Sequence, residues 1–181
     1  MIITGVGSRK VPNEVIEFIK QLPLRDHVVR SGGALGCDHA FESTTQKLEI
    51  YVPWKSFNEH ITDSCNKNNR ICLSDIPSSL VDIAREVASD VHPMFRTLSF
   101  GVQQLHTRNV FQVLGKNLDE SEKSDMLICW TPDGANTFDK CTSKTGGTGT
   151  AIKLASLFNI PVYNICNDKD LDSICEIFNL W

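Results

Sequence analysis

The sequence predicts an α/β fold, in which a single parallel sheet is covered by helices on both faces. Short apolar, β-branched segments alternate along the chain with segments whose apolar residues recur at helical spacing. The predicted strands are continuous apolar runs, which is typical of parallel strands that are buried on both sides. A length of 181 residues without an internal repeat or linker indicates one domain, residues 1–181.

The first half of the chain predicts three strands, at residues 2–6, 27–30 and 49–52. A helix begins near Pro12, whose missing N–H is not needed in a first helical turn, and it stops before Pro23. A second helix runs from about Ala40 to Lys47. Residues 55–76 show no clear period and many Asn, Asp and Ser, so we predict a long excursion there, a candidate lid or insertion.

The second half predicts two more strands, at residues 126–130 and 161–165. Helices are expected at residues 77–91, 98–114, after the glycine-rich stretch 146–150, and at residues 171–178. Gly115 is placed to end the second of these helices. Strands and helices therefore alternate to the end of the chain, as a parallel sheet requires.

Composition narrows the class of protein. No apolar run approaches the roughly 20 residues of a membrane-spanning helix, and the apolar stretch at the start is too short for a signal peptide, so we expect a cytoplasmic protein. The formal net charge of −4 disfavours a DNA-binding protein, although a local basic patch stays open. The seven cysteines include no CxxC pair and are expected to be reduced, and no metal or cofactor is predicted.

Three glycine-bearing turns follow predicted strands and should meet at one edge of the sheet, where open parallel sheets bind ligands. Glycine lets backbone N–H groups approach an oxyanion closely, and a helix N-terminus adds partial positive charge. A single such turn is more often only a tight connection, but several at one edge favour phosphate binding. The residues expected to bind phosphate are Gly7, Ser8, Arg9, Ser31, Gly32, Gly33, Gly146, Gly147, Thr148, Gly149 and Thr150.

The turns match neither GxxxxGK followed by Ser or Thr, nor GxGxxG with an acidic residue roughly 20 positions on. Together with segments 51–55, 108–110 and 129–132, they resemble the SLOG superfamily, which includes DprA (Smf) and the Lonely-guy (LOG) nucleotide hydrolases. The resemblance spans nearly the whole chain and is greatest to small stand-alone DprA-like proteins often encoded by phages. It implies a Rossmann-like sheet that binds nucleotides or nucleotide-derived ligands, in the host cytoplasm if the protein is phage-encoded.

Hydrolysis of an N-glycosidic bond is less clearly implied. LOG enzymes carry Pro-Gly-Gly-x-Gly-Thr-x-x-Glu with a catalytic Glu, whereas this chain has Thr145 at the first position and Lys153 at the last. Asp38 and Glu42 are four residues apart and would share one helix face, where a carboxylate could stabilise an oxocarbenium-like state. Alternatively, Asp38 caps the helix and Glu42 pairs with a cation.

Other residues extend the predicted site. Arg108 and Asn109 are expected to contact a phosphate or sugar hydroxyl, the alternative for Arg108 being a surface side chain with its stem on the core. Trp54 and Trp130 each end a predicted strand and are candidates for stacking on a base, with core packing as the alternative.

We therefore expect a protein that binds a phosphorylated nucleotide or nucleotide-derived small molecule, as a sensor or a sequestering protein. Two alternatives stay open. One is a nucleoside-monophosphate N-glycosidase that uses Asp38 or Glu42, and the other, less favoured, is a DprA-like protein that binds single-stranded DNA. A homo-oligomer is expected because related folds often dimerise, and no membrane partner is expected.

Overall fold

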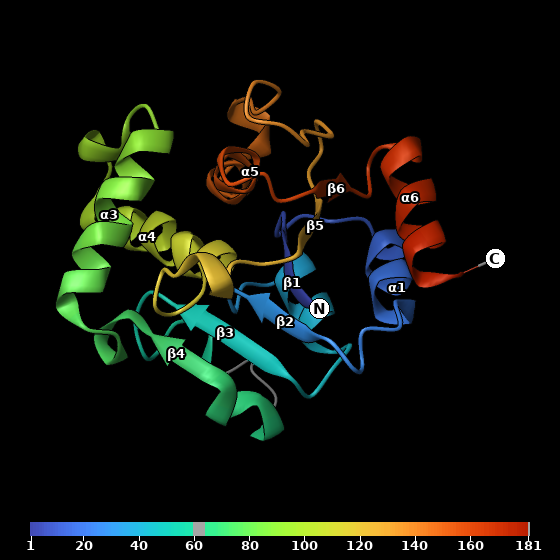
Figure 1. Ribbon diagram of the computed structural model, residues 1–181, viewed down its shortest axis with the longest axis horizontal. Coiled ribbons are helices and arrows are strands. Elements are labelled where there is room, and N and C mark those ends of the chain that lie inside the picture. The colour runs from blue at the N-terminus through green and yellow to red at the C-terminus, as the bar shows by residue number, and fades with distance from the viewer. Residues whose placement is uncertain (60–63, 181) are drawn as a thin grey trace.

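The computed structural model describes residues 1–59 and 64–180, and its centre is a six-stranded sheet in which every neighbouring pair of strands is parallel. The strand order is β4-β3-β2-β1-β5-β6 (Figure 1). The strands are β1 (Ile2–Gly7), β2 (Val28–Ser31), β3 (Leu48–Val52), β4 (Arg70–Cys72), β5 (Met126–Trp130) and β6 (Val162–Asn164). The predicted parallel sheet is thus confirmed.

Helices cover both faces of this sheet, which confirms the predicted α/β architecture (Figure 1). One face packs against α1 (Asn13–Gln21), α2 (Cys37–Glu42) and α6 (Asp168–Phe178), and the other against α3 (Ser78–Val91), α4 (Phe100–Leu114) and α5 (Thr148–Leu157). Because successive strand residues point to opposite faces, Ile128 belongs to the first core and its neighbours Leu127 and Cys129 to the second. In the described part of the chain no helix is both long and apolar enough to cross a membrane.

The helix ends follow local sequence signals. Pro12 and Pro77 directly precede α1 and α3, and Gly115 ends α4 with φ of 84°, a conformation that favours glycine. The prediction for α2 was too long, because this helix ends at Glu42 rather than near Lys47. The hydroxyl groups of Ser43 and Thr44 donate back to carbonyls of the last turn, which favours ending the helix there.

The segment 55–76 contains a strand that the sequence did not predict. Arg70–Cys72 form β4 at the edge of the sheet, paired with β3, and short 3-10 turns flank it at Ser64–Asn69 and Leu73–Asp75. Three residues is too short a run to show a period, which explains the omission. Residues 60–63 of this predicted excursion lie outside the described residues, and its role as a lid stays a prediction.

The strand order reverses beside β1, and this position determines where a ligand site can form. From β1 the chain builds the sheet outward through β2, β3 and β4, and it then returns to the other side of β1 with β5 and β6. The ends of β1 and β5 are level, with Gly7 paired to Trp130. The connections leaving these two strands diverge to opposite faces, so a crevice opens between them at the carboxyl edge, where sheets of this type bind ligands.

Candidate functional site

A cavity of about 420 Å³ occupies this crevice. Its lining comes from the turn after β1, the turn after β2, one side of α4, and the loop that leads into α5. The lining residues are Val6, Gly7, Ser8, Arg9, Lys10, Ala34, Asp38, Val102, Leu105, His106, Arg108, Asn109, Gln112, Lys144, Thr145, Gly146, Gly147, Thr148 and Ala151.

The structure brings together most of the residues that the sequence nominated for phosphate binding. Those that line the cavity are Gly7, Ser8, Arg9, Arg108, Asn109, Gly146, Gly147 and Thr148, together with Asp38. Ser31, Gly32, Gly33, Gly149 and Thr150 do not line it. Among these, Gly32 still acts on the site through Arg108.

Arg108 is a buried cation held across the cavity from the glycine-rich loop. Its guanidinium lies against Gly32 so closely that a Cβ built on Gly32 would fall 1.6 Å from Nη1. Nη2 is 3.8 Å from Oδ2 of Asp38, and both side chains are less than one-tenth exposed. Nε is buried and has no hydrogen-bond partner. A buried guanidinium with an unused donor is well suited to bind an oxyanion, because its planar fork of N–H groups donates to phosphate oxygens.

Asp38 connects this cation to the turn after β1. Its Oδ1 accepts a hydrogen bond from the N–H of Gly7 at 3.3 Å. Burial raises the pKa of Asp38 to about 6, with the Glu42 carboxylate adding to the effect and Arg108 opposing it. The carboxyl group therefore changes its charge near neutral pH, at a point where an anion would contact Arg108.

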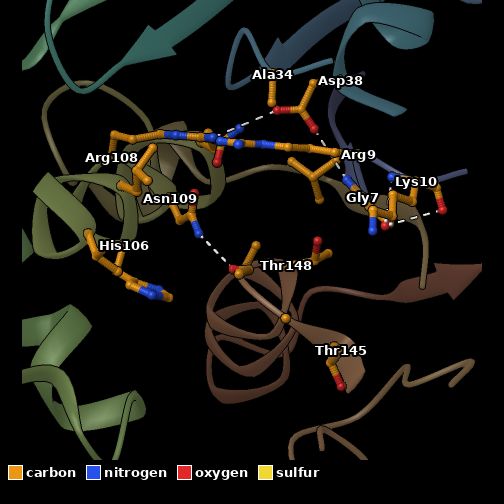
Figure 2. A pocket seen from close by; sticks show the side chains of 18 of the residues that line it. Gly7, Arg9, Lys10, Ala34, Asp38, His106, Arg108, Asn109, Thr145 and Thr148 are labelled. Atoms are coloured by element: carbon orange, nitrogen blue, oxygen red, sulfur yellow. Dashed lines mark hydrogen bonds and ion pairs between the residues drawn. The ribbon is translucent and has the colours of Figure 1, made fainter. Parts of the chain in front are cut away.

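The guanidinium of Arg9 lies in the same cavity as that of Arg108. Figure 2 shows the side chains of Arg9 and Arg108 extending toward each other beside Asp38, with Thr148 across the cavity. Arg9 is exposed and lies over the ring of Phe57, 6.0 Å from its centroid. Among the described lining residues, Arg9, Lys10, Arg108 and Lys144 are cationic and Asp38 alone is a carboxylate. The cavity is thus a local basic patch on a chain whose formal net charge is −4.

The loop before α5 borders this cavity with Lys144, Thr145, Gly146 and Gly147. Asp133 accepts hydrogen bonds from the hydroxyls of Thr142 at 2.7 Å and Thr145 at 2.6 Å, which hold the loop in shape. Asn109 donates from Nδ2 to the carbonyl of Gly147 at 3.0 Å, visible in Figure 2. The first N–H groups of a helix have no acceptor within it, and they carry partial positive charge. The start of α5 therefore lines the same cavity as the guanidinium groups of Arg9 and Arg108.

Gly146 and Gly147 leave this surface open. A Cβ built on either residue would meet no atom within 4 Å. Gly146 has φ of 64° and ψ of −150°, which only glycine adopts readily, whereas Gly147 has an ordinary helical conformation. Neither the backbone nor the packing at Gly147 requires glycine, and the residue is exposed at the cavity lining.

Glu42 lies behind the site rather than in it. Its Oε1 accepts hydrogen bonds from Ser31 Oγ at 2.5 Å and from the N–H of Gly33 at 3.0 Å, and the side chain is 4% exposed. Those bonds hold the turn after β2, against which Arg108 packs. Glu42 does not line the cavity, so of the two nominated carboxylates Asp38 alone does.

The two tryptophans lie away from the cavity lining. Trp54 lines a separate hollow of about 370 Å³ beside α3 and contacts the edge of Phe57. Trp130 packs on the core formed by α1, α2 and α6, while its carbonyl accepts a hydrogen bond from the N–H of Ser8. Lys153, at the position of the LOG glutamate, also lies outside the lining, and its ammonium donates to the carbonyl of Val91 at 3.2 Å.

Sequence reasoning missed several lining residues. Lys10, Lys144 and Thr145 are neighbours of the nominated turns, so a wider window around each glycine would have found them. Val102, Leu105, His106 and Gln112 come from α4, where they recur with Arg108 and Asn109 at spacings of three and four residues, on one side of the helix. Among the described residues, no group of three His, Cys, Asp or Glu is placed to hold a metal ion.

Comparison with known proteins defines the class of fold. No family model matches the sequence, and no curated protein matches it. The fold is similar to a solved structure of DNA processing protein A from Helicobacter pylori, with a TM-score of 0.53 and 14% sequence identity. That structure was described for the single-stranded DNA binding mode of the Helicobacter protein. The similarity covers 100% of this chain and 81% of that chain. The chain therefore has a DprA-like, Rossmann-like α/β fold.

Proposed function

We propose that this protein binds a phosphorylated nucleotide or nucleotide-derived small molecule in the cavity between β1 and β5, as a sensor or sequestering protein. The observation that carries the proposal is the arrangement around Arg108. This buried guanidinium, with an unpartnered Nε, lies together with Arg9 opposite the open glycine turn at the start of α5. We also propose that the chain is a member of the SLOG superfamily related to phage-encoded DprA-like proteins.

The electrostatics favour an anion with several oxygens. Burial lowers the pKa of Arg108, which expresses the cost of holding its charge away from water, and Asp38 offsets only part of that cost. A phosphate would offer acceptors to Nε of Arg108, to the guanidinium of Arg9 and to the N–H groups of α5 at the same time. The cavity of about 420 Å³ falls within the size range of small-molecule sites.

Binding is tested by isothermal titration of the purified protein with nucleoside 5′-monophosphates, cyclic mononucleotides and ADP-ribose, paired with native mass spectrometry of the protein as isolated. We expect at least one nucleotide to bind. Arg108→Met should lower the affinity for that nucleotide about 10- to 100-fold, because a hydrogen bond to a charged group is lost. Arg85→Met is the matched control, because Arg85 lies outside the cavity. No binding by any of these compounds would refute the proposal.

A second candidate function is binding of single-stranded DNA, favoured by the fold shared with DNA processing protein A and by the basic lining of the cavity. This candidate predicts that affinity for an oligonucleotide falls steeply with salt concentration. A gel-shift titration with oligo(dT) at low salt tests it, and the absence of any shift would exclude it.

A nucleoside-monophosphate N-glycosidase remains the enzymatic alternative. Asp38 is the carboxylate that lines the cavity, and it would stabilise the oxocarbenium-like state. The same titration mixtures, analysed by chromatography, would show free base and ribose 5-phosphate if the protein is a hydrolase. Asp38→Asn should then bind without cleaving.

A further inference from the structure

The cavity lining combines cationic and uncharged polar residues. Arg9, Lys10 and Lys144 surround its exposed side, whereas the wall formed by α4 also carries three uncharged polar residues: His106, Asn109 and Gln112. Burial lowers the pKa of His106 to about 4, and its Nδ1 shares a hydrogen bond of 2.7 Å with the hydroxyl of Thr150, so the imidazole is neutral at physiological pH. The lining could therefore contact both an anionic group and an uncharged polar group of one ligand.

Gln112 is the unusual member of this wall. Its side chain is fully buried, yet neither Oε1 nor Nε2 has a hydrogen-bond partner. A buried polar atom without a hydrogen-bond partner is costly, and Gln112 has two such atoms, the donor Nε2 and the acceptor Oε1. The backbone does not explain why a glutamine stands at position 112. The carbonyl of this residue accepts a hydrogen bond from Thr4 Oγ1, and any other side chain at the position would allow the same bond.

We infer that Gln112 recognises the base of the bound nucleotide, by pairing its carboxamide with a base edge on which a donor lies beside an acceptor. This inference rests on the proposed nucleotide binding and adds to it the part of the ligand that determines specificity. A glutamine carboxamide forms two parallel hydrogen bonds with such an edge, as it does with adenine N6 and N7. Because the side chain is fully buried, a base would reach the carboxamide only after rotation about the aliphatic torsions of Gln112 brings it to the cavity.

The assignment also accounts for the tryptophans. Neither Trp54 nor Trp130 lines the cavity, so the base is not held by stacking on either ring. Instead Val6, Val102, Leu105 and Ala151 provide apolar contact for the faces of the base, while Gln112 reads its edge. The proposed contact to the base is thus a hydrogen-bonding residue of α4, whereas the sequence nominated Trp54 and Trp130 for stacking on it.

The test compares ligands with and without a base. Affinities for ribose 5-phosphate and for the four common nucleoside 5′-monophosphates are measured by isothermal titration on the wild-type protein and on Gln112→Met, which keeps the length of the side chain but removes the amide. Gln104→Met is the matched control, since Gln104 lies on the same helix and outside the cavity. Thermal denaturation of each variant verifies that it folds.

We expect the preferred nucleotide to bind wild type about 10- to 100-fold more tightly than ribose 5-phosphate, the value of one bidentate pair. Gln112→Met should remove most of that preference, leave the affinity for ribose 5-phosphate unchanged and keep or raise the melting temperature. An unchanged preference in Gln112→Met, or equal affinities for all the ligands in wild type, would overturn the inference while leaving phosphate binding intact. Failure of every ligand, ribose 5-phosphate included, would instead remove the proposed function and the inference with it.

Discussion

Replacing Gly147 with alanine separates what this glycine does for the fold from what it does for a ligand. Gly147 has φ of −62° and ψ of −23°, which alanine adopts without strain, and a Cβ there would meet no atom within 4 Å. Alanine restricts the unfolded chain more than glycine does, so the variant should be more stable by about 0.4–1 kcal/mol. For a chain of this length that is a rise in melting temperature of roughly 1–4 °C.

The same methyl group should impair binding. It would project from the surface that presents the first N–H groups of α5, and it would keep a phosphate from close approach. Losing one hydrogen bond to a charged group costs about 1.5–3 kcal/mol, which is an affinity loss of about 10- to 100-fold. Thermal denaturation and isothermal titration of one preparation measure both effects.

Gly146→Ala is the matched control for this prediction. Its φ of 64° with ψ of −150° lies in a region that is essentially restricted to glycine, so alanine there should cost about 1–3 kcal/mol of stability. The two neighbouring substitutions therefore have opposite expected effects on stability. If Gly147→Ala were stabilised and bound nucleotides with wild-type affinity, the argument that this glycine is reserved for a ligand would be refuted.

Four further predictions concern Gly32, Asp38 and Trp54. Gly32→Ala should weaken nucleotide binding and lower the melting temperature, because the added Cβ would overlap the guanidinium of Arg108; unchanged affinity in titration would contradict that packing. Because the pKa of Asp38 is raised to about 6, the affinity for sulfate, whose charge is constant, should rise as the pH falls from about 8 to about 5, and Asp38→Asn should abolish this dependence. The same raised pKa means that the contribution of Asp38 to stability is greatest at low pH and declines as the pH rises from 3.8 to about 6, which pH-dependent denaturation measures. Trp54→Ala should change mononucleotide affinity less than about twofold, as expected for a surface residue away from the site; a larger loss by titration would mean that the ligand extends beyond the cavity.

The sheet and the glycine turns could be predicted from the sequence because each leaves a local pattern of residues, and each pattern fixes where its segment lies in the fold. Buried parallel strands leave continuous apolar runs, and their carboxyl ends meet at one edge whatever the strand order. Gly7 and Gly147 could therefore be assigned to the same edge of the sheet without any knowledge of the topology. Strand β4 was missed because three residues at a sheet edge carry no such signal.

Strand order explains why Trp54, a candidate for stacking on a base, lies away from the cavity. Trp54 follows β3, which is separated from β1 by β2, and neighbouring strands lie about 4.8 Å apart. The end of β3 thus belongs to the same edge of the sheet but not to the crevice where the strand order reverses. Trp130 is the last residue of β5, at the crevice itself, but the alternation of side chains directs it to the core of α1, α2 and α6.

The wall formed by α4 shows where sequence reasoning loses information. All residues from 106 to 114 of this helix are buried, polar ones included, so no exposed polar face distinguishes the side that meets a ligand from the side that meets the core. Arg108 was nominated through its resemblance to a family motif, whereas Gln112, one turn further along, reads in the sequence as an ordinary surface residue. Only the packing shows that the carboxamide of Gln112 is buried, has no hydrogen-bond partner and belongs to a residue of the cavity lining. For these three reasons, substitution of Gln112 best distinguishes recognition of a base from binding of a phosphate.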